Sequence, residues 1–280
     1  MTRMGVMGLG TMGSGITQAA IESGFEVVAV EVDDAHLSSG ATRIRTGLER
    51  RVKSGKLSQH QVGGLLSGLN LSTSVSSFAD CDIVVEAVFE DASVKAAALS
   101  GISGAVGPQT IVASNTSSIS ITSLSRNLKH PENFIGMHFF NPVPVMKLLE
   151  VVRGYLTSDA TASAALDIGR RMGKEAVEVR DYPGFISNRV LMPMINEAIF
   201  ALMEDVAGRD DIDKVMKLGM NHPMGPLELA DFIGLDVCLD IMNVLYSGFK
   251  DPKYRPCPLL VNMVNSGKTG RKAGAGFYQY

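Results

Sequence analysis

Three glycines near the start of the chain constrain its fold more than any other feature. Gly8, Gly10 and Gly13 have the spacing GxGxxG within GLGTMG. The short apolar run MGVM precedes them, and a segment with helical spacing, 12–24, follows. A strand that turns sharply into a closely packed helix needs glycine at such positions, because a side chain would block the turn and the packing. The chain therefore predicts a strand, a glycine turn and a helix at its start.

The same segment supplies two further features that a dinucleotide site requires. The helix over 12–24 offers free backbone amides and the positive end of its dipole to a pyrophosphate. The next strand, expected over 25–32, carries the acid Glu31 near its end. A carboxylate there accepts hydrogen bonds from a ribose 2′-hydroxyl and repels a 2′-phosphate. We therefore predict that the three glycines and Glu31 bind NAD in preference to NADP, because Arg43 and the basic residues after it come too late in the chain to replace Glu31.

Short apolar strands alternate with helical segments through the first two thirds of the chain. This alternation predicts a mostly parallel, doubly wound sheet of the Rossmann type, an α/β fold with helices on both faces. Ligands of such sheets bind beyond the carboxyl ends of the strands, so residues that follow strands are candidates for function. The expected strands are 4–8, 25–32, 81–88, 110–117, 133–140, 146–154 and 174–181. The expected helices are 12–24, 35–58, 91–106, 119–128 and 159–173.

The pattern changes after DYPGF, residues 181–185. From there the chain is helical and rich in Met and Leu, with no convincing strand before its last few residues. We expect a Rossmann-type NAD-binding domain over 1–182 and an all-α C-terminal domain over 183–280. Pro193 is expected to bend a long helix of this domain, and Asp210 to cap the next one. Helices this apolar exceed what a domain of ~100 residues buries internally, which predicts a homodimer through the C-terminal domain.

The composition limits the partners and the compartment. Hydrophobic residues make up 45% and charged residues 20% of the chain, and the net charge is −3. These values are typical of a soluble globular protein and give no indication of nucleic acid or an anionic membrane as the main partner. No stretch approaches the ~18 uninterrupted apolar residues of a membrane span. The three cysteines and five histidines show no metal-binding spacing, which predicts a cytoplasmic protein with reduced thiols and no metal.

The stretch HFFNPVPVMKLLE, residues 138–150, contains the candidate catalytic pair. A nicotinamide enzyme that oxidises an alcohol must remove the hydroxyl proton, and imidazole, with a pKa of ~6.5, suits this task. A carboxylate on the other ring nitrogen fixes the tautomer and stabilises the imidazolium. NPVP reverses the chain between two expected strands, which allows His138 to face Glu150. The residues alone leave open a second interpretation, a buried structural histidine bonded to a carbonyl.

Several longer stretches of the chain resemble a single enzyme family. They are GLGTMGSGI, VVEAVFED, SNTSS, HFFNPVPVMKLLEVV, DYPGFISNRV, MKLGMNHPMGPLELADFIGLD and GAGFYQY. On these stretches the chain is similar, nearly from end to end, to the short-chain L-3-hydroxyacyl-CoA dehydrogenases, and in length to the bacterial 3-hydroxybutyryl-CoA dehydrogenases among them. The resemblance implies reversible oxidation of a (3S)-3-hydroxyacyl-CoA, such as 3-hydroxybutyryl-CoA, to the 3-ketoacyl-CoA with NAD. It leaves open the acyl chain length and the pathway, whether fatty acid breakdown, butanoate synthesis or aromatic degradation.

The resemblance also implies a role for each matching residue. His138 matches the catalytic base and Glu150 the acid that orients it. Ser117, of SNTSS, and Asn188, of FISNR, match residues that hydrogen-bond the substrate, with Ser117 also near the nicotinamide. The positions that match cofactor contacts are Glu90, Lys95, Asn141 and Lys272.

One departure from the family pattern concerns the coenzyme A end of the substrate. The family holds this end with a serine and a lysine on the helical stretch after the second strand, whereas this chain has Gly47 near the serine position. Arg50, Lys53 and Lys56 are the nearby cations, and the sequence does not decide which of them holds the phosphates.

Two other functions are possible for a chain of this architecture. The first is another β-hydroxyacid dehydrogenase of similar architecture, such as the 3-hydroxyisobutyrate type, whose catalytic lysine motif is missing here. The second is a structural relative without activity, similar to the lambda crystallins. The retained set of Ser117, His138, Glu150 and Asn188 argues against both.

Overall fold

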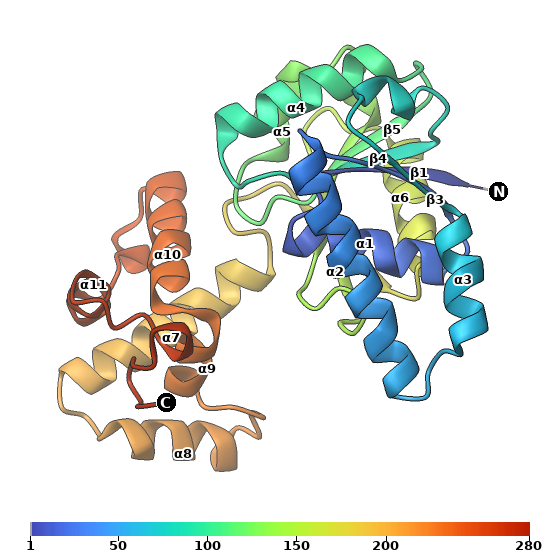
Figure 1. Cartoon of the computed structure of the whole chain (residues 1–280). Helices are drawn as coiled ribbons and strands as arrows, with labels where there is room; N and C mark the ends of the chain where they lie inside the picture. Colours follow the sequence, from blue (N-terminus) through green and yellow to red (C-terminus); the bar gives the residue numbers. More distant parts are fainter. Residues whose placement is uncertain (1) are drawn as a thin grey trace. The chain divides into compact units, whose positions relative to one another are not determined.

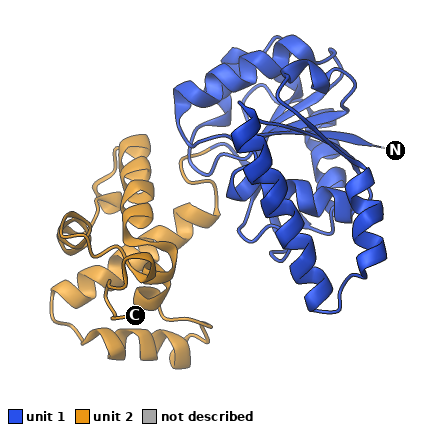
Figure 2. Ribbon diagram, in the orientation of Figure 1, with its two compact units in different colours: residues 1–181 blue, residues 182–280 orange. Residues whose placement is uncertain are grey.

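The computed structural model describes residues 2–280, which form two compact units (Figure 2). The first unit ends at Asp181, and the second comprises Tyr182–Tyr280. Among the described residues, no helix is both long and apolar enough to cross a membrane.

An eight-stranded sheet forms the centre of the first unit, which confirms the predicted doubly wound fold (Figure 1). The described strands pair in parallel, except that β6 and β7 are antiparallel. The strand order reverses between β1 and β4, and sheets of this kind bind ligands at such a switch point. The order from one edge is β3 (Leu69–Ser72), β2 (Glu26–Val30), β1 (Arg3–Met7), β4 (Ile83–Glu86), β5 (Ile111–Ser114), β6 (Phe134–Phe139), β7 (Leu148–Arg153) and β8 (Glu175–Arg180).

Helices cover both faces of this sheet, because the strands are apolar on both sides. Met4 and Val6 of β1 belong to the core on one face, to which α1, α2 and α6 contribute. Gly5 lies between them in the strand and faces the other side, where the Phe78 ring is 2.7 Å from the position of a Cβ atom. The helices of this unit are α1 (Thr11–Glu22), α2 (Asp34–Lys53), α3 (Gln59–Ser67), α4 (Ala92–Ala105), α5 (Ile121–Leu124) and α6 (Asp159–Arg171).

The second unit is helical, with isolated β-bridges close to the C-terminus. Its core joins buried side chains of α7, α9, α10 and α11, including Ile199, Leu227, Leu245 and Leu260. Pro193 lies inside α7, and the bend expected at this residue stays a prediction. The helices are α7 (Ser187–Met203), α8 (Arg209–Gly219), α9 (Pro226–Ile233), α10 (Leu235–Phe249) and α11 (Pro258–Asn265).

Three local predictions were wrong. The single helix expected over 35–58 ends at Lys53, because the chain turns at Gly55, which has a positive φ of 71°. The helix α3 and the strand β3 follow it and were not predicted. Asp210 does not cap α8, since Gly208 occupies that position and the aspartate lies in the first turn of the helix.

Candidate active site

The glycine turn between β1 and α1 has the close contacts that its spacing predicts. Gly8 has a φ of +92°, and a Cβ atom there would lie 2.8 Å from the carbonyl oxygen of Ala87. At Gly13 a Cβ atom would lie 1.7 Å from the carbonyl oxygen of Gly8. Around Gly10, by contrast, no heavy atom lies within 4 Å of that position. The turn is therefore closed toward the protein at two glycines and open at the third, as the approach of a pyrophosphate requires.

Glu31 follows β2 and lies against this turn. One carboxylate oxygen accepts a hydrogen bond from the Leu9 amide at 2.5 Å, and the other accepts one from the Val32 amide at 3.1 Å. The Arg43 guanidinium donates to the Leu9 carbonyl at 3.2 Å from the neighbouring helix α2. Arg43 is 34 residues from Leu9 in the sequence, and its guanidinium reaches this residue because α1 and α2 pack side by side.

Glu90 holds the SNTSS turn that follows β5. Its Oε1 atom accepts hydrogen bonds from the Thr116 hydroxyl at 2.5 Å and from the amides of Ser117 and Ser118 at 2.9 and 3.2 Å. Burial raises the pKa of Glu90, but the Lys95 ammonium and the bonds from Thr116 and Ser117 outweigh it and lower the pKa below 4.5. Ionised Glu90 therefore positions the backbone around Ser117, the expected substrate contact.

A buried network lies beneath this turn, and the sequence did not reveal it. The Lys95 ammonium is 2.8 Å from Oε1 of Glu86 and 3.2 Å from Oε2 of Glu90. Glu86 and Lys95 are fully buried, and Oε2 of Glu86 accepts a hydrogen bond from the Ser114 hydroxyl at 2.6 Å. Lys95 thus connects Glu86, the last residue of β4, with Glu90 in the loop that follows this strand. The predicted cofactor contact of Lys95 stays a prediction.

His138 and Glu150 are directly opposite each other on the antiparallel strands β6 and β7. The distance from Nδ1 of His138 to Oε2 of Glu150 is 2.8 Å. Only 9% of the histidine side chain and 4% of the glutamate side chain are exposed. Because a carboxylate accepts, Nδ1 is the donor in this bond. The expected pair is therefore present, and its catalytic role stays a prediction.

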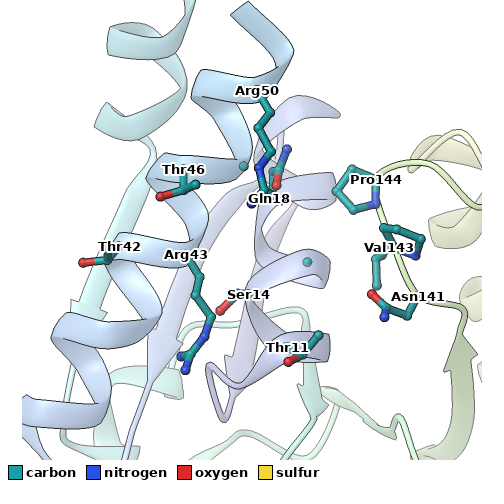
Figure 3. A pocket seen from close by; sticks show the side chains of 13 residues that line it. Thr11, Ser14, Gln18, Thr42, Arg43, Thr46, Arg50, Asn141, Val143 and Pro144 are labelled. Carbon is teal, nitrogen blue, oxygen red and sulfur yellow. The ribbon is translucent and has the colours of Figure 1, made fainter. Parts of the chain in front are cut away.

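A cleft of about 300 Å³ opens between α1, α2 and the loop after β6 (Figure 3). Arg43 and Arg50 extend from α2 at its edge, and Gln18 lies on the facing side of α1. A Cβ atom at Gly47 would lie 2.0 Å from Oε1 of Gln18, so a larger residue at this position would displace the Gln18 side chain that lines the cleft. The loop forms the third side of the cleft with Asn141, Pro142, Val143 and Pro144.

Two predicted site residues belong to the second unit. Asn188 lies in the first turn of α7 and is half-buried. Lys272 follows α11, and its ammonium is 2.5 Å from Oδ2 of Asp236. Within the described part of the chain, no three His, Cys, Asp or Glu side chains are grouped so that they could hold a metal ion.

Comparison with known proteins identifies the family. Residues 3–182 match the family "3-hydroxyacyl-CoA dehydrogenase, NAD binding domain", and residues 184–280 match "3-hydroxyacyl-CoA dehydrogenase, C-terminal domain". The chain belongs to the 3-hydroxyacyl-CoA dehydrogenase family. It is an NAD-dependent dehydrogenase, and its reaction is the oxidation of a 3-hydroxyacyl-CoA. The glycine turn described above fits this cofactor.

Similar proteins cover the whole chain. The probable 3-hydroxybutyryl-CoA dehydrogenase of Bacillus subtilis strain 168 is 50% identical over 98% of this chain and 96% of its own length. The 3-hydroxybutyryl-CoA dehydrogenase of Bradyrhizobium diazoefficiens is 48% identical over 99% of this chain and 95% of its own. The crystal structure of (S)-3-hydroxybutyryl-CoA dehydrogenase from Ralstonia eutropha has a TM-score of 0.97 and 47% identity, and the match covers 99% of this chain and 98% of that one.

Proposed function

We propose that the chain interconverts (3S)-3-hydroxybutyryl-CoA and acetoacetyl-CoA, with His138 and Glu150 as the acid–base pair. The single observation that carries the proposal is the buried 2.8 Å contact between His138 and Glu150 on adjacent strands. The names of the full-length relatives support the four-carbon substrate.

His138 performs the proton transfer in this mechanism. In oxidation the imidazole Nε2 takes the proton of the C3 hydroxyl, because Nδ1 is bonded to Glu150. Glu150 holds the ring in this tautomer and stabilises the imidazolium that forms. The glycine turn would hold NAD, which would supply the acceptor for the hydride of C3. In reduction, the imidazolium donates its proton to the C3 oxygen as negative charge develops there.

Ser117 and Asn188 complete the proposed substrate contacts. The Ser117 amide is fixed by Glu90 at 2.9 Å, so the backbone that carries its hydroxyl is held in place before substrate arrives. Preorganised donors of this kind stabilise charge that develops in the transition state. Asn188 would contribute its amide from the second unit.

The proposed cofactor contacts divide between the two ends of NAD. The glycine turn would hold the pyrophosphate, and Glu31 would hold the adenosine ribose. Glu90 and Asn141 would contact the nicotinamide half, with the Lys95 ammonium supporting Glu90 at 3.2 Å. Lys272 is the proposed contact from the second unit.

The cleft between α1 and α2 suits the anionic nucleotide end of coenzyme A. Arg43 and Arg50 line it, whereas Lys53 and Lys56 do not. Guanidinium groups bind phosphate through parallel hydrogen bonds, which favours them over a solvated lysine. We therefore assign this role to Arg50, with Arg43 as a second cation.

The domain over 183–280 is proposed to form a homodimer, and the domain over 1–182 to bind NAD. Large apolar side chains of the second unit are exposed, among them Val190, Leu218 and Phe232. Such exposure marks an interaction surface in a soluble protein. A monomeric mass in solution would refute the dimer.

The cysteines are buried free thiols, which accords with the proposed cytoplasmic location.

The function is tested by NADH consumption with 3-ketoacyl-CoA substrates of increasing chain length. We expect the highest kcat/KM with acetoacetyl-CoA. A maximum at a long acyl chain would refute the four-carbon assignment, and no turnover at any length would refute the reaction.

A further inference from the structure

Lys174 is a buried lysine that neither the motifs nor the proposed mechanism uses. It directly follows the turn that ends α6, where Gly173 has a φ of +71°. The amide of Gly173 donates to the carbonyl of Arg170, and the amide of Lys174 donates to that of Gly169. These two bonds form a Schellman motif, which fixes the backbone of Lys174 relative to the helix. Only 8% of the residue is exposed.

The Lys174 ammonium bonds the loop between the two catalytic strands. Its Nζ atom donates to the carbonyl oxygens of Val143 and Met146, the second at 2.8 Å. Burial lowers the pKa of Lys174, and the negative charge of Glu22 partly opposes this shift. The groups that hydrogen-bond the ammonium are carbonyl oxygens of the loop. Burying an ammonium whose bonded partners are neutral is costly, so a role beyond packing is expected.

The bonded loop is the third wall of the cleft. Asn141 to Pro144 line the cleft opposite the two arginines (Figure 3). Val143 also packs closely on α1, because a Cβ atom at Gly15 would lie 3.1 Å from the Cβ atom of Val143. The carbonyl of Pro142 accepts the amides of Val145 and Met146 at 2.9 and 3.0 Å, which closes the loop into a tight turn. Lys174 therefore holds this turn from its inner side.

We propose that Lys174 is a positioning residue that fixes the cleft wall against which the nucleotide end of coenzyme A binds. It acts through the loop over 141–146 and contacts no reacting atom. The inference rests on the proposed function of the cleft. It makes the affinity for the acyl-CoA substrate depend on a residue that does not itself line the cleft.

The test compares Lys174→Met with Lys147→Met, which removes an exposed lysine that follows the same loop. Each variant is assayed for NADH-dependent reduction of two substrates, acetoacetyl-CoA and acetoacetyl-pantetheine. The second is a truncated thioester without the nucleotide end. Lys174→Met removes both bonds to the loop. We expect the KM for acetoacetyl-CoA to rise roughly tenfold, because the released loop no longer holds the cleft wall in its binding position, with kcat nearly unchanged. The KM for acetoacetyl-pantetheine should not change, and Lys147→Met should match the wild type for both substrates.

Hydrogen exchange gives an independent structural readout. In Lys174→Met the amides of Val145 and Met146 should exchange faster, while those of β6 and β7 keep their protection. If the Met variant does not fold, Lys174→Gln, which retains a donor, should show a smaller effect of the same kind.

The outcomes separate this inference from the proposed function. Equal KM increases for both thioesters, or no increase for either, would overturn the role of Lys174. A wild-type enzyme with the same KM for both thioesters would instead refute the assignment of the cleft to coenzyme A.

Discussion

Replacing Glu150 by Gln tests whether the carboxylate, and not only the shape of the site, serves His138. Gln has nearly the same size, so the packing between β6 and β7 is preserved. The change removes the charge from an almost fully buried contact of 2.8 Å. A hydrogen bond to a charged group contributes about 1.5–3 kcal/mol, which corresponds to a rate loss of roughly 10- to 150-fold.

The tautomer of His138 sets the upper limit of the effect. The amide of Gln can rotate and donate to Nδ1, which favours the neutral ring with its proton on Nε2. This disfavours the imidazolium that donates in reduction, and in oxidation it blocks proton abstraction. Loss of the orienting carboxylate in Ser-His-Asp enzymes costs ~10⁴ in kcat for this reason. We therefore expect kcat of Glu150→Gln to fall between roughly 10- and 10⁴-fold, with little change in the KM for NADH.

The assay is the reduction of acetoacetyl-CoA followed by NADH absorbance, with circular dichroism to verify folding. The control is Glu175→Gln, an exposed glutamate on the adjacent strand β8. A folded Glu150→Gln enzyme with wild-type kcat would refute the role given to the carboxylate. A defect confined to the KM for NADH would contradict the assignment equally.

Three further predictions follow from other parts of the site. The wild type should use NAD at least ~10-fold better than NADP, and Glu31→Gln should narrow this ratio, which the two KM values measure. Arg50→Met should raise the KM for acetoacetyl-CoA roughly tenfold while Lys56→Met should not, because Arg50 lines the cleft and Lys56 does not. The folded state lowers the pKa of Glu90 below 4.5, so its stabilising contribution is present above that pH and is lost as the pH falls below it. The difference in urea midpoint between the wild type and Glu90→Gln should therefore shrink between pH 6 and pH 3.

The sequence predicted the strands well where periodicity and composition agreed. The Val-rich strand β2 and the strands β6 and β7 lie within one or two residues of their predicted bounds, because continuous apolar runs mark strands buried on both faces. Strand β3 was missed, since it is a short edge strand with two exposed residues. Helix α3 had a usable signal, because Ser58 and Gln61 form a capping box at its start.

Side chains that meet only through tertiary packing could not be predicted in the same way. NPVP indicated a chain reversal, and this local signal brought His138 and Glu150 together. Arg43 reaches the glycine turn from another helix, and Lys174 reaches the loop over 141–146 from the end of α6. The spacing of residues along the sequence does not indicate such contacts. In the sequence Glu86 is one more residue of a buried strand, and its bond to Lys95 is present only in the folded structure.

Replacement of His138 by Ala tests the central claim most directly. The measurement is kcat for acetoacetyl-CoA reduction, together with NADH affinity from fluorescence titration. We predict that kcat falls by ~10²–10⁴, the usual contribution of a general acid–base residue, while the NADH dissociation constant stays within about twofold of the wild type. Full reduction activity in a folded His138→Ala enzyme would contradict the proposed mechanism.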